Sequence, residues 1–140
     1  MTSKKVRFIG KSDDVWVEIS KLRGGARIAA IAYLGDSAPT LLGPFRHGDT
    51  IVCDASDERI RSGSTSKAAL SEFVKRGVRL YSLKNLHAKV ICIGSTAVVG
   101  SMNASTSSTQ MREAAVFLSG SHEVAECRQY IKGLLKGAVA

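Results

Sequence analysis

The feature that most constrains the fold is a series of short apolar segments, separated by helical patterns in the first half of the chain and by turns later. Apolar runs of about 4–8 residues are typical of buried strands. Strands that alternate with helices and are then followed by further strands favour a mixed sheet with helices packed on it. We therefore predict an α/β fold formed by one domain over residues 1–140. The expected strands lie at residues 6–9, 27–34, 50–53, 78–81, 87–93 and 97–99, and within 112–119.

Three segments have the apolar spacing and the end signals of helices. The first begins near Ser12, with acidic residues where the helix dipole favours them, and ends before Gly24. The second follows the polar stretch 55–64, which we expect to be irregular, and ends at Gly77; the third covers residues 123–135. The expected core includes Trp16, Phe8, Ala68, Leu70, Phe73, Val74, Val124, Cys127, Tyr130, Ile131 and Leu134.

The chain is strongly basic. Twenty Lys and Arg residues stand against 12 Asp and Glu residues, which gives a net charge of +8. Eight of the basic residues fall between Arg59 and Lys89, where the only acid is Glu72. Such an excess favours polyanionic partners, with nucleic acid before an anionic membrane.

The apolar segments and the cysteines indicate the compartment. The longest strongly apolar stretch, residues 29–34, is far shorter than a transmembrane helix, so we expect no membrane insertion. Cys53, Cys92 and Cys127 are odd in number, widely spaced and set among apolar neighbours. They therefore indicate reduced, buried thiols, and we expect a cytoplasmic protein.

Three other kinds of site are disfavoured by the sequence. Residues 43–50 have the glycine spacing of a phosphate-binding loop, but Asp49 stands where that loop needs lysine, and the segment precedes a strand instead of following one. The cysteines and histidines do not have zinc-ligand spacing, and no G-x-S-x-G nucleophile elbow occurs. We expect neither a metal nor another cofactor.

One segment, residues 86–103, carries most of the reactive side chains. His87 and Lys89 alternate at the start of a predicted strand, so they share one of its faces. Ser101 and Asn103 end the next predicted strand and are expected to share a face as well. If these strands pair, an imidazole, an ammonium, a hydroxyl and an amide come together. This set supplies a nucleophile and several donors to phosphate oxygens.

These residues resemble the signature of the phospholipase D superfamily, in which an H-x-K motif is followed by G-S-x-N. His87 and Lys89 match the first part, and Gly100, Ser101 and Asn103 match the second. The residues Arg76-Gly77-Val78 resemble the family's approach to the motif, and Glu113 resembles its downstream acid. The family's fuller motif has an aspartate at the position of Gly94, but its restriction-endonuclease branch tolerates the loss of that residue.

The resemblance implies a phospholipase D-like fold and a metal-independent phosphodiesterase, most simply an endonuclease that cleaves DNA. Each active site of the family uses two H-x-K motifs, so a chain with one motif is expected to form a homodimer. His87 would then attack phosphorus and form a phosphohistidine. Lys89, Asn103 and Ser101 would bind the phosphate, and Glu113 would orient His87.

The net charge favours nucleic acid over lipid as the substrate. Between the two nucleic acids, we expect DNA in preference to RNA. Two alternatives remain open from the sequence. One is a phospholipase D-type enzyme that acts on a lipid or another phosphodiester. The other is a nucleic-acid-binding module with a degenerate site.

Overall fold

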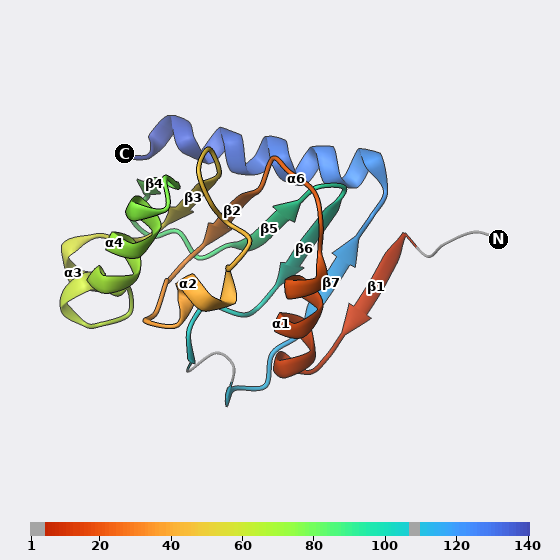
Figure 1. Cartoon of the computed structure of the whole chain (residues 1–140), viewed down its shortest axis with the longest axis horizontal. Coiled ribbons are helices and arrows are strands. Elements are labelled where there is room, and N and C mark those ends of the chain that lie inside the picture. Colours follow the sequence, from red (N-terminus) through yellow and green to blue (C-terminus); the bar gives the residue numbers. More distant parts are fainter. Residues whose placement is uncertain (1–4, 107–109) are drawn as a thin grey trace.

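The computed structural model describes residues 5–106 and 110–140, without the side chains of residues 12 and 13. Its strands form a seven-stranded sheet in the order β1-β7-β6-β5-β2-β3-β4 (Figure 1). The strands β2, β3 and β4 are mutually parallel, and the remaining pairs are antiparallel, which confirms the predicted mixed sheet. Their bounds are β1 (Val6–Ile9), β2 (Ile28–Ile31), β3 (Thr50–Cys53), β4 (Arg79–Ser82), β5 (Lys89–Ile93), β6 (Thr96–Gly100) and β7 (Ala115–Leu118).

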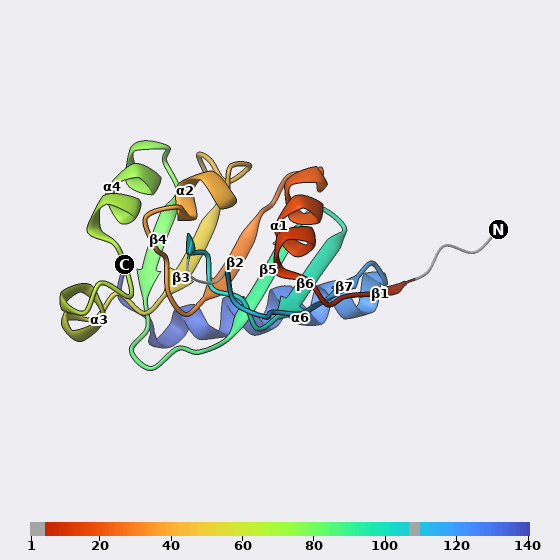
Figure 2. The ribbon, with the colours of Figure 1, turned by 90° about the horizontal axis from the view of Figure 1, so that it is seen from below.

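Helices cover both faces of this sheet (Figure 2). The long helix α6 (Ser121–Leu134) runs along one face, and α1 (Ser12–Lys21), α2 (Ala38–Leu41) and α4 (Lys67–Lys75) lie on the other. The short helix α3 (Asp57–Arg61) lies at the β4 end of the sheet, and a 3-10 turn (Leu135–Gly137) follows α6. None of the helices in the described residues is long and apolar enough to span a bilayer.

The strand β5 shows how the sequence divides its side chains between the two layers. Ile91 and Ile93 join the larger core cluster, which includes Trp16 and Phe73 from α1 and α4. Val90 and Cys92 point to the opposite face and belong to the cluster that α6 closes. This alternation is the period-two pattern of a strand buried on both faces, and it confirms β5 as a central strand.

Four predicted core residues, Phe8, Ala68, Val74 and Tyr130, are exposed, and this part of the prediction is wrong. Phe8 is 69% exposed because β1 is an edge strand, in which only Ile9 is buried. Val74 and Tyr130 lie on helix surfaces that face away from the sheet and are also largely exposed. In α4 the buried residues are instead Ala69 and Phe73.

Two short helices were not predicted from the sequence. The helix α2 contains four residues, with a proline in its first turn. The helix α3 lies within the stretch that we expected to be irregular, and it has no buried residue. Because helix prediction depends on apolar periodicity over several turns, neither segment carried a usable signal.

The segment with phosphate-loop spacing has a structural role. Asp49 is 5% exposed and accepts a hydrogen bond of 2.6 Å from Nε of Arg27 and one of 2.8 Å from the backbone N–H of Arg46. These bonds join the start of β3 to the segment before β2. They occupy the carboxylate, which agrees with the rejection of this loop as a phosphate site.

Candidate active site

The predicted site residues gather at one end of the sheet. The chain enters β5 there and leaves β2 beside it, because Lys89 pairs with Ile31 in the antiparallel register. The end of β6 and the start of β7 meet at the same end, where Gly100 pairs with Ala115. The parallel strands β3 and β4 also finish there. Sheet topology therefore brings together residues that are far apart in the sequence.

His87 and Lys89 are in direct contact. Nζ of Lys89 lies 3.0 Å from Nδ1 and 3.3 Å from Nε2 of His87. Lys89 is the first residue of β5 and is 8% exposed, whereas His87 precedes the strand and is exposed. The imidazole of His87 is therefore open to solvent, and the buried ammonium of Lys89 donates a hydrogen bond to a nitrogen of its ring.

Burial acts on the acidity of Lys89. It lowers the pKa of the ammonium below the ordinary lysine value, and the negative charge of Glu113 opposes this shift. Glu113 thus lies near enough to influence Lys89, as expected for an acid brought to the site from the segment before β7. Its predicted hydrogen bond to His87 stays a prediction.

Asn103 and Ser101 lie beyond the end of β6, not within it as we predicted. Oδ1 of Asn103 accepts a hydrogen bond of 3.1 Å from the backbone N–H of Tyr33. The ring of Tyr33 stands edge-on to that of His87, with centroids 6.3 Å apart. Oγ of Ser101 instead accepts a hydrogen bond of 3.1 Å from the backbone N–H of Ala114, next to Glu113. Asn103 is thus bound to Tyr33, whose ring contacts that of His87, and Ser101 is bonded to the segment that carries Glu113.

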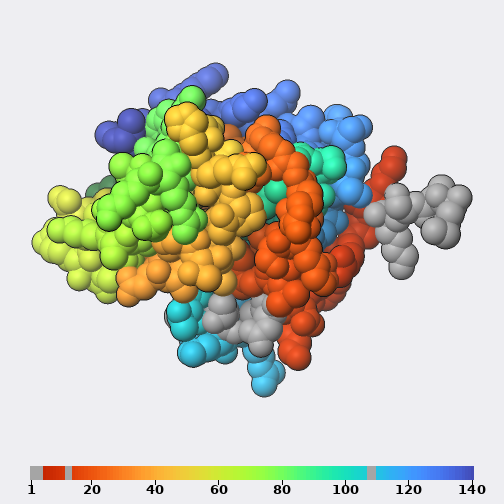
Figure 3. All heavy atoms as spheres, viewed as in Figure 1, coloured from red at the N-terminus to blue at the C-terminus, as the bar shows by residue number. Residues whose placement is uncertain are grey.

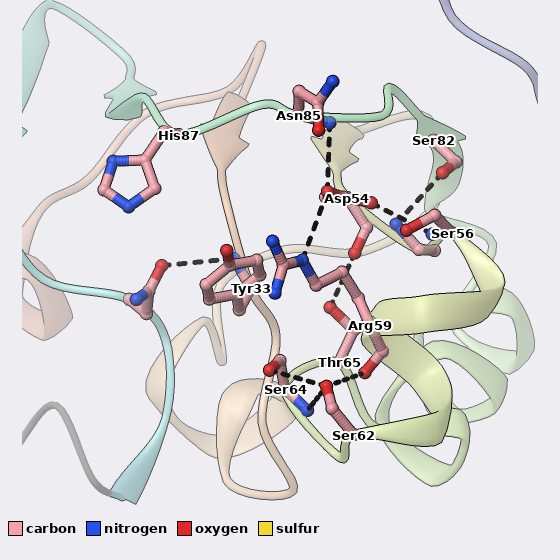
Figure 4. Close-up of polar contacts among 12 residues, drawn as sticks. Tyr33, Asp54, Ser56, Arg59, Ser62, Ser64, Thr65, Ser82, Asn85 and His87 are labelled. Atoms are coloured by element: carbon pink, nitrogen blue, oxygen red, sulfur yellow. Dashed lines mark hydrogen bonds and ion pairs between the residues drawn. The ribbon is translucent and has the colours of Figure 1, made fainter.

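A second group of polar residues adjoins the site and was not predicted from the sequence (Figure 4). The guanidinium of Arg59 lies over the ring of Tyr33, 5.2 Å from its centroid. Nε of Arg59 lies 3.7 Å from Oδ2 of Asp54, which follows β3 and is 1% exposed. The sequence carried one signal for this group, namely an aspartate directly after a predicted buried strand. Such a residue places a carboxylate at this end of the sheet.

The carboxylate of Asp54 is charged despite its burial. Burial alone raises its pKa, but hydrogen bonds from Ser56 and from the backbone of Asn85, together with the charge of Arg59, outweigh it and hold the pKa below the ordinary value. The backbone N–H groups of Ser56 and Asn85 each lie 3.0 Å from the carboxylate. Asp54 therefore ties the start of α3 to the loop that leads to His87.

Gly94 takes the place of the family aspartate at the other end of β5. At about 3.3 Å per residue, this position lies about 16 Å from Lys89 along the strand. Gly94 has a φ of +58°, and a Cβ there would lie 2.4 Å from the carbonyl oxygen of Arg23. An aspartate would be strained at this turn and would not reach His87, so its loss does not remove a group that touches the reacting atoms.

No three His, Cys, Asp or Glu side chains within residues 5–106 and 110–140 lie close enough together to bind a metal ion.

The chain matches one family model in sequence. Residues 49–135 match the model described as the PLD-like domain of cardiolipin synthase. The matched range contains all five predicted site residues: His87, Lys89, Ser101, Asn103 and Glu113. No protein of curated function matches the chain.

Solved structures share the fold at low sequence identity. NucT from Helicobacter pylori has a TM-score of 0.71 and 15% identity, over 97% of this chain and 98% of that chain. Nuc from Salmonella typhimurium, a phospholipase D family member, has a TM-score of 0.68 and 19% identity, over 95% and 93%. TrmBL2, an archaeal chromatin protein, has a TM-score of 0.65 and 8% identity, over 99% of this chain and 55% of that chain.

The family model covers well over half of the chain, and the shared fold extends over nearly all of it. The family match and the shared fold are consistent with the motif residues found at the end of the sheet. Together they support the expected activity, that of a phosphodiester hydrolase. The chain belongs to the phospholipase D superfamily.

Proposed function

We propose that this chain is a metal-independent endonuclease that cleaves DNA through a covalent phosphohistidine at a homodimer interface. The observation that carries the proposal is the contact between exposed His87 and buried Lys89, with Nζ 3.0 Å from Nδ1. An open imidazole backed by a fixed cation suits attack on an anionic phosphodiester, because the cation offsets the charge that develops on phosphorus oxygens.

The reaction has two displacements at phosphorus. A ring nitrogen of His87 forms a bond to phosphorus while the bond to the leaving oxygen breaks, and the partner subunit's His87 gives that oxygen a proton. The partner subunit's His87 then removes a proton from water. The water oxygen bonds to phosphorus, and the bond to His87 breaks.

Lys89 and Asn103 act on the non-bridging oxygens. When a phosphate enters, one of its oxygens accepts the Lys89 hydrogen bond, which frees the ring nitrogen of His87 to attack. Asn103 uses Oδ1 for the backbone of Tyr33, so its N–H groups are available to a second oxygen. Both donors are fixed before substrate arrives, which is the arrangement that stabilises a transition state efficiently.

Nucleic acid is the substrate that the charge favours. The net charge is +8, and the basic segment from Arg59 to Lys84 includes α3 and α4, which form one end of the visible surface in Figure 3. The similarity to TrmBL2, whose structure shows a mode of DNA binding, points the same way. The three cysteines are free thiols, and we keep the cytoplasm as the proposed location.

Cleavage of plasmid DNA should persist in excess EDTA, because Lys89 supplies the positive charge that two-metal nucleases take from ions. The measurement is nicking and linearisation of supercoiled plasmid on a gel, beside release of headgroup from phosphatidylcholine vesicles in the same buffer. Loss of cleavage in EDTA with recovery in Mg²⁺ would contradict the histidine mechanism. Cleavage of the lipid alone would favour a lipid phosphodiesterase, and no cleavage of either would favour a degenerate site.

Replacing Glu113 by Gln should lower kcat severalfold to about a thousandfold, or about 1–4 kcal/mol of barrier, because the acid that orients His87 loses its charge. The alkaline limb of the pH–rate profile should also move to lower pH. Glu113 opposes the fall in the pKa of Lys89, so without it Lys89 loses its proton earlier. Glu72→Gln, at a 47% exposed side chain paired with Arg76, is the matched control. An unchanged profile in Glu113→Gln would assign Glu113 a surface role.

A further inference from the structure

The cluster of Asp54, Arg59 and Tyr33 places a second cation beside the reacting histidine. Figure 4 shows the Arg59 guanidinium at the Tyr33 ring, and the Tyr33 ring is nearly perpendicular to that of His87, at 80°, with centroids 6.3 Å apart. One aromatic ring therefore separates this guanidinium from the imidazole. The motif residues do not include this cation, and the mechanism above does not use it.

Arg59 is fixed in place by the backbone of its own segment. Oγ1 of the fully buried Thr65 donates to the carbonyl oxygen of Asp54 at 2.8 Å, and the backbone N–H of Thr65 donates to that of Arg59 at 3.1 Å. The backbone N–H of Ser66 donates to the carbonyl of Leu34, just beyond Tyr33, at 2.7 Å. Helix α3 is thereby fastened to the ends of β2 and β3. A cation held in this way loses little conformational entropy when it binds an anion.

The guanidinium is also accessible. The side chain of Arg59 is 38% exposed, whereas that of Asp54 is 2% exposed. Asp54 approaches Nε and the guanidinium lies over the Tyr33 ring, but within the described residues no hydrogen bond joins the two terminal nitrogens of Arg59 to an acceptor. These nitrogens carry a planar set of N–H donors that matches the oxygens of a phosphate.

We propose that Arg59 binds the phosphate next to the scissile one on the same nucleic-acid strand, with Asp54 and Tyr33 as the residues that position it. The inference rests on the proposed endonuclease function and names its substrate class: a phosphodiester with a second phosphate one nucleotide away. A polynucleotide offers such a phosphate at every step, whereas a simple phosphodiester offers none. Arg59 therefore favours polynucleotides over isolated phosphodiesters.

The test compares dinucleotides that differ by one phosphate. Wild-type protein should cleave a dinucleotide carrying an extra 5′- or 3′-phosphate with a kcat/KM about tenfold to a hundredfold above that of the unphosphorylated dinucleotide, as expected for one hydrogen-bonded ion pair. Arg59→Gln should abolish this advantage and leave the unphosphorylated dinucleotide within about twofold of wild type. Lys132→Gln removes one charge from α6, which runs along one face of the sheet and is not part of the cluster around Arg59, and should keep the advantage.

An advantage that survives in Arg59→Gln, or an equal loss on all substrates, would overturn the inference; the equal loss would assign Arg59 a structural role. If wild type cleaves no substrate, the endonuclease proposal fails separately. In that case calorimetry measures the affinities of wild type and Arg59→Gln for the same dinucleotides, which tests whether Arg59 binds the second phosphate. Equal affinities of the two proteins for the phosphorylated form would overturn it, and a selective loss in Arg59→Gln would support it.

Discussion

His87→Ala should lower cleavage by more than about 10⁴-fold, because this change removes both the nucleophile and, in the partner subunit, the acid and base. His87 is exposed and lies outside the core clusters, so the variant should keep its fold. Its affinity for DNA should also stay near that of wild type, since affinity depends on many Lys and Arg contacts to phosphates. The measurements are plasmid nicking, thermal unfolding by circular dichroism and DNA binding at a fixed salt concentration.

Mixtures of the two proteins test the dimer in the same experiment. If both copies of His87 serve one site, a mixed dimer is inactive, and a tenfold excess of His87→Ala should lower wild-type activity by about tenfold after subunit exchange. Activity that does not change on mixing would contradict a shared site. Residual activity in His87→Ala alone would contradict the covalent step, for which an acid-labile phosphohistidine found by mass spectrometry is the positive result.

Lys89→Met should lower kcat by about 100-fold to 1,000-fold, the effect of losing one preorganised donor to a developing oxyanion. The variant should unfold at no lower temperature than wild type. Burial lowers the pKa of Lys89 in the folded protein, so the folded state holds this ammonium less favourably than the unfolded state does. The buried charge of Lys89 therefore lowers the free energy of unfolding at neutral pH. A neutral side chain of similar length removes this destabilisation.

Measuring both activity and stability distinguishes the catalytic role of Lys89 from the effect of its buried charge on the folded state. Unfolding temperature and kcat are measured for Lys89→Met beside Lys84→Met, which changes an exposed lysine in the loop before His87. A Lys89→Met protein that keeps its activity would remove Lys89 from the mechanism. A protein that has lost its fold would contradict the direction of the pKa shift.

The sequence was sufficient to predict the fold class, because its signals are local. Seven apolar segments with strand-like length became the seven strands, and the apolar segment around Val90 and Ile91 became a strand that is buried on both faces. The His87 and Lys89 motif indicated the superfamily, which the family model confirms. Where the local signal was missing or ambiguous, prediction failed: α3 has no buried residue, and the apolar residue Phe8 lies on an edge strand.

Only the tertiary structure decided how the site is completed. Asn103 binds the backbone of Tyr33 across 70 residues of sequence, and Asp54 binds that of Asn85 across 31. Such contacts depend on the order of strands in the sheet, which places the ends of β2, β3, β5 and β6 together, and apolar periodicity carries no information about that order. The charge and spacing of Arg59 were visible in the sequence. Its position against Tyr33, one ring away from His87, was not visible, because hydrogen bonds from Thr65 and Ser66 to distant backbone groups place its helix.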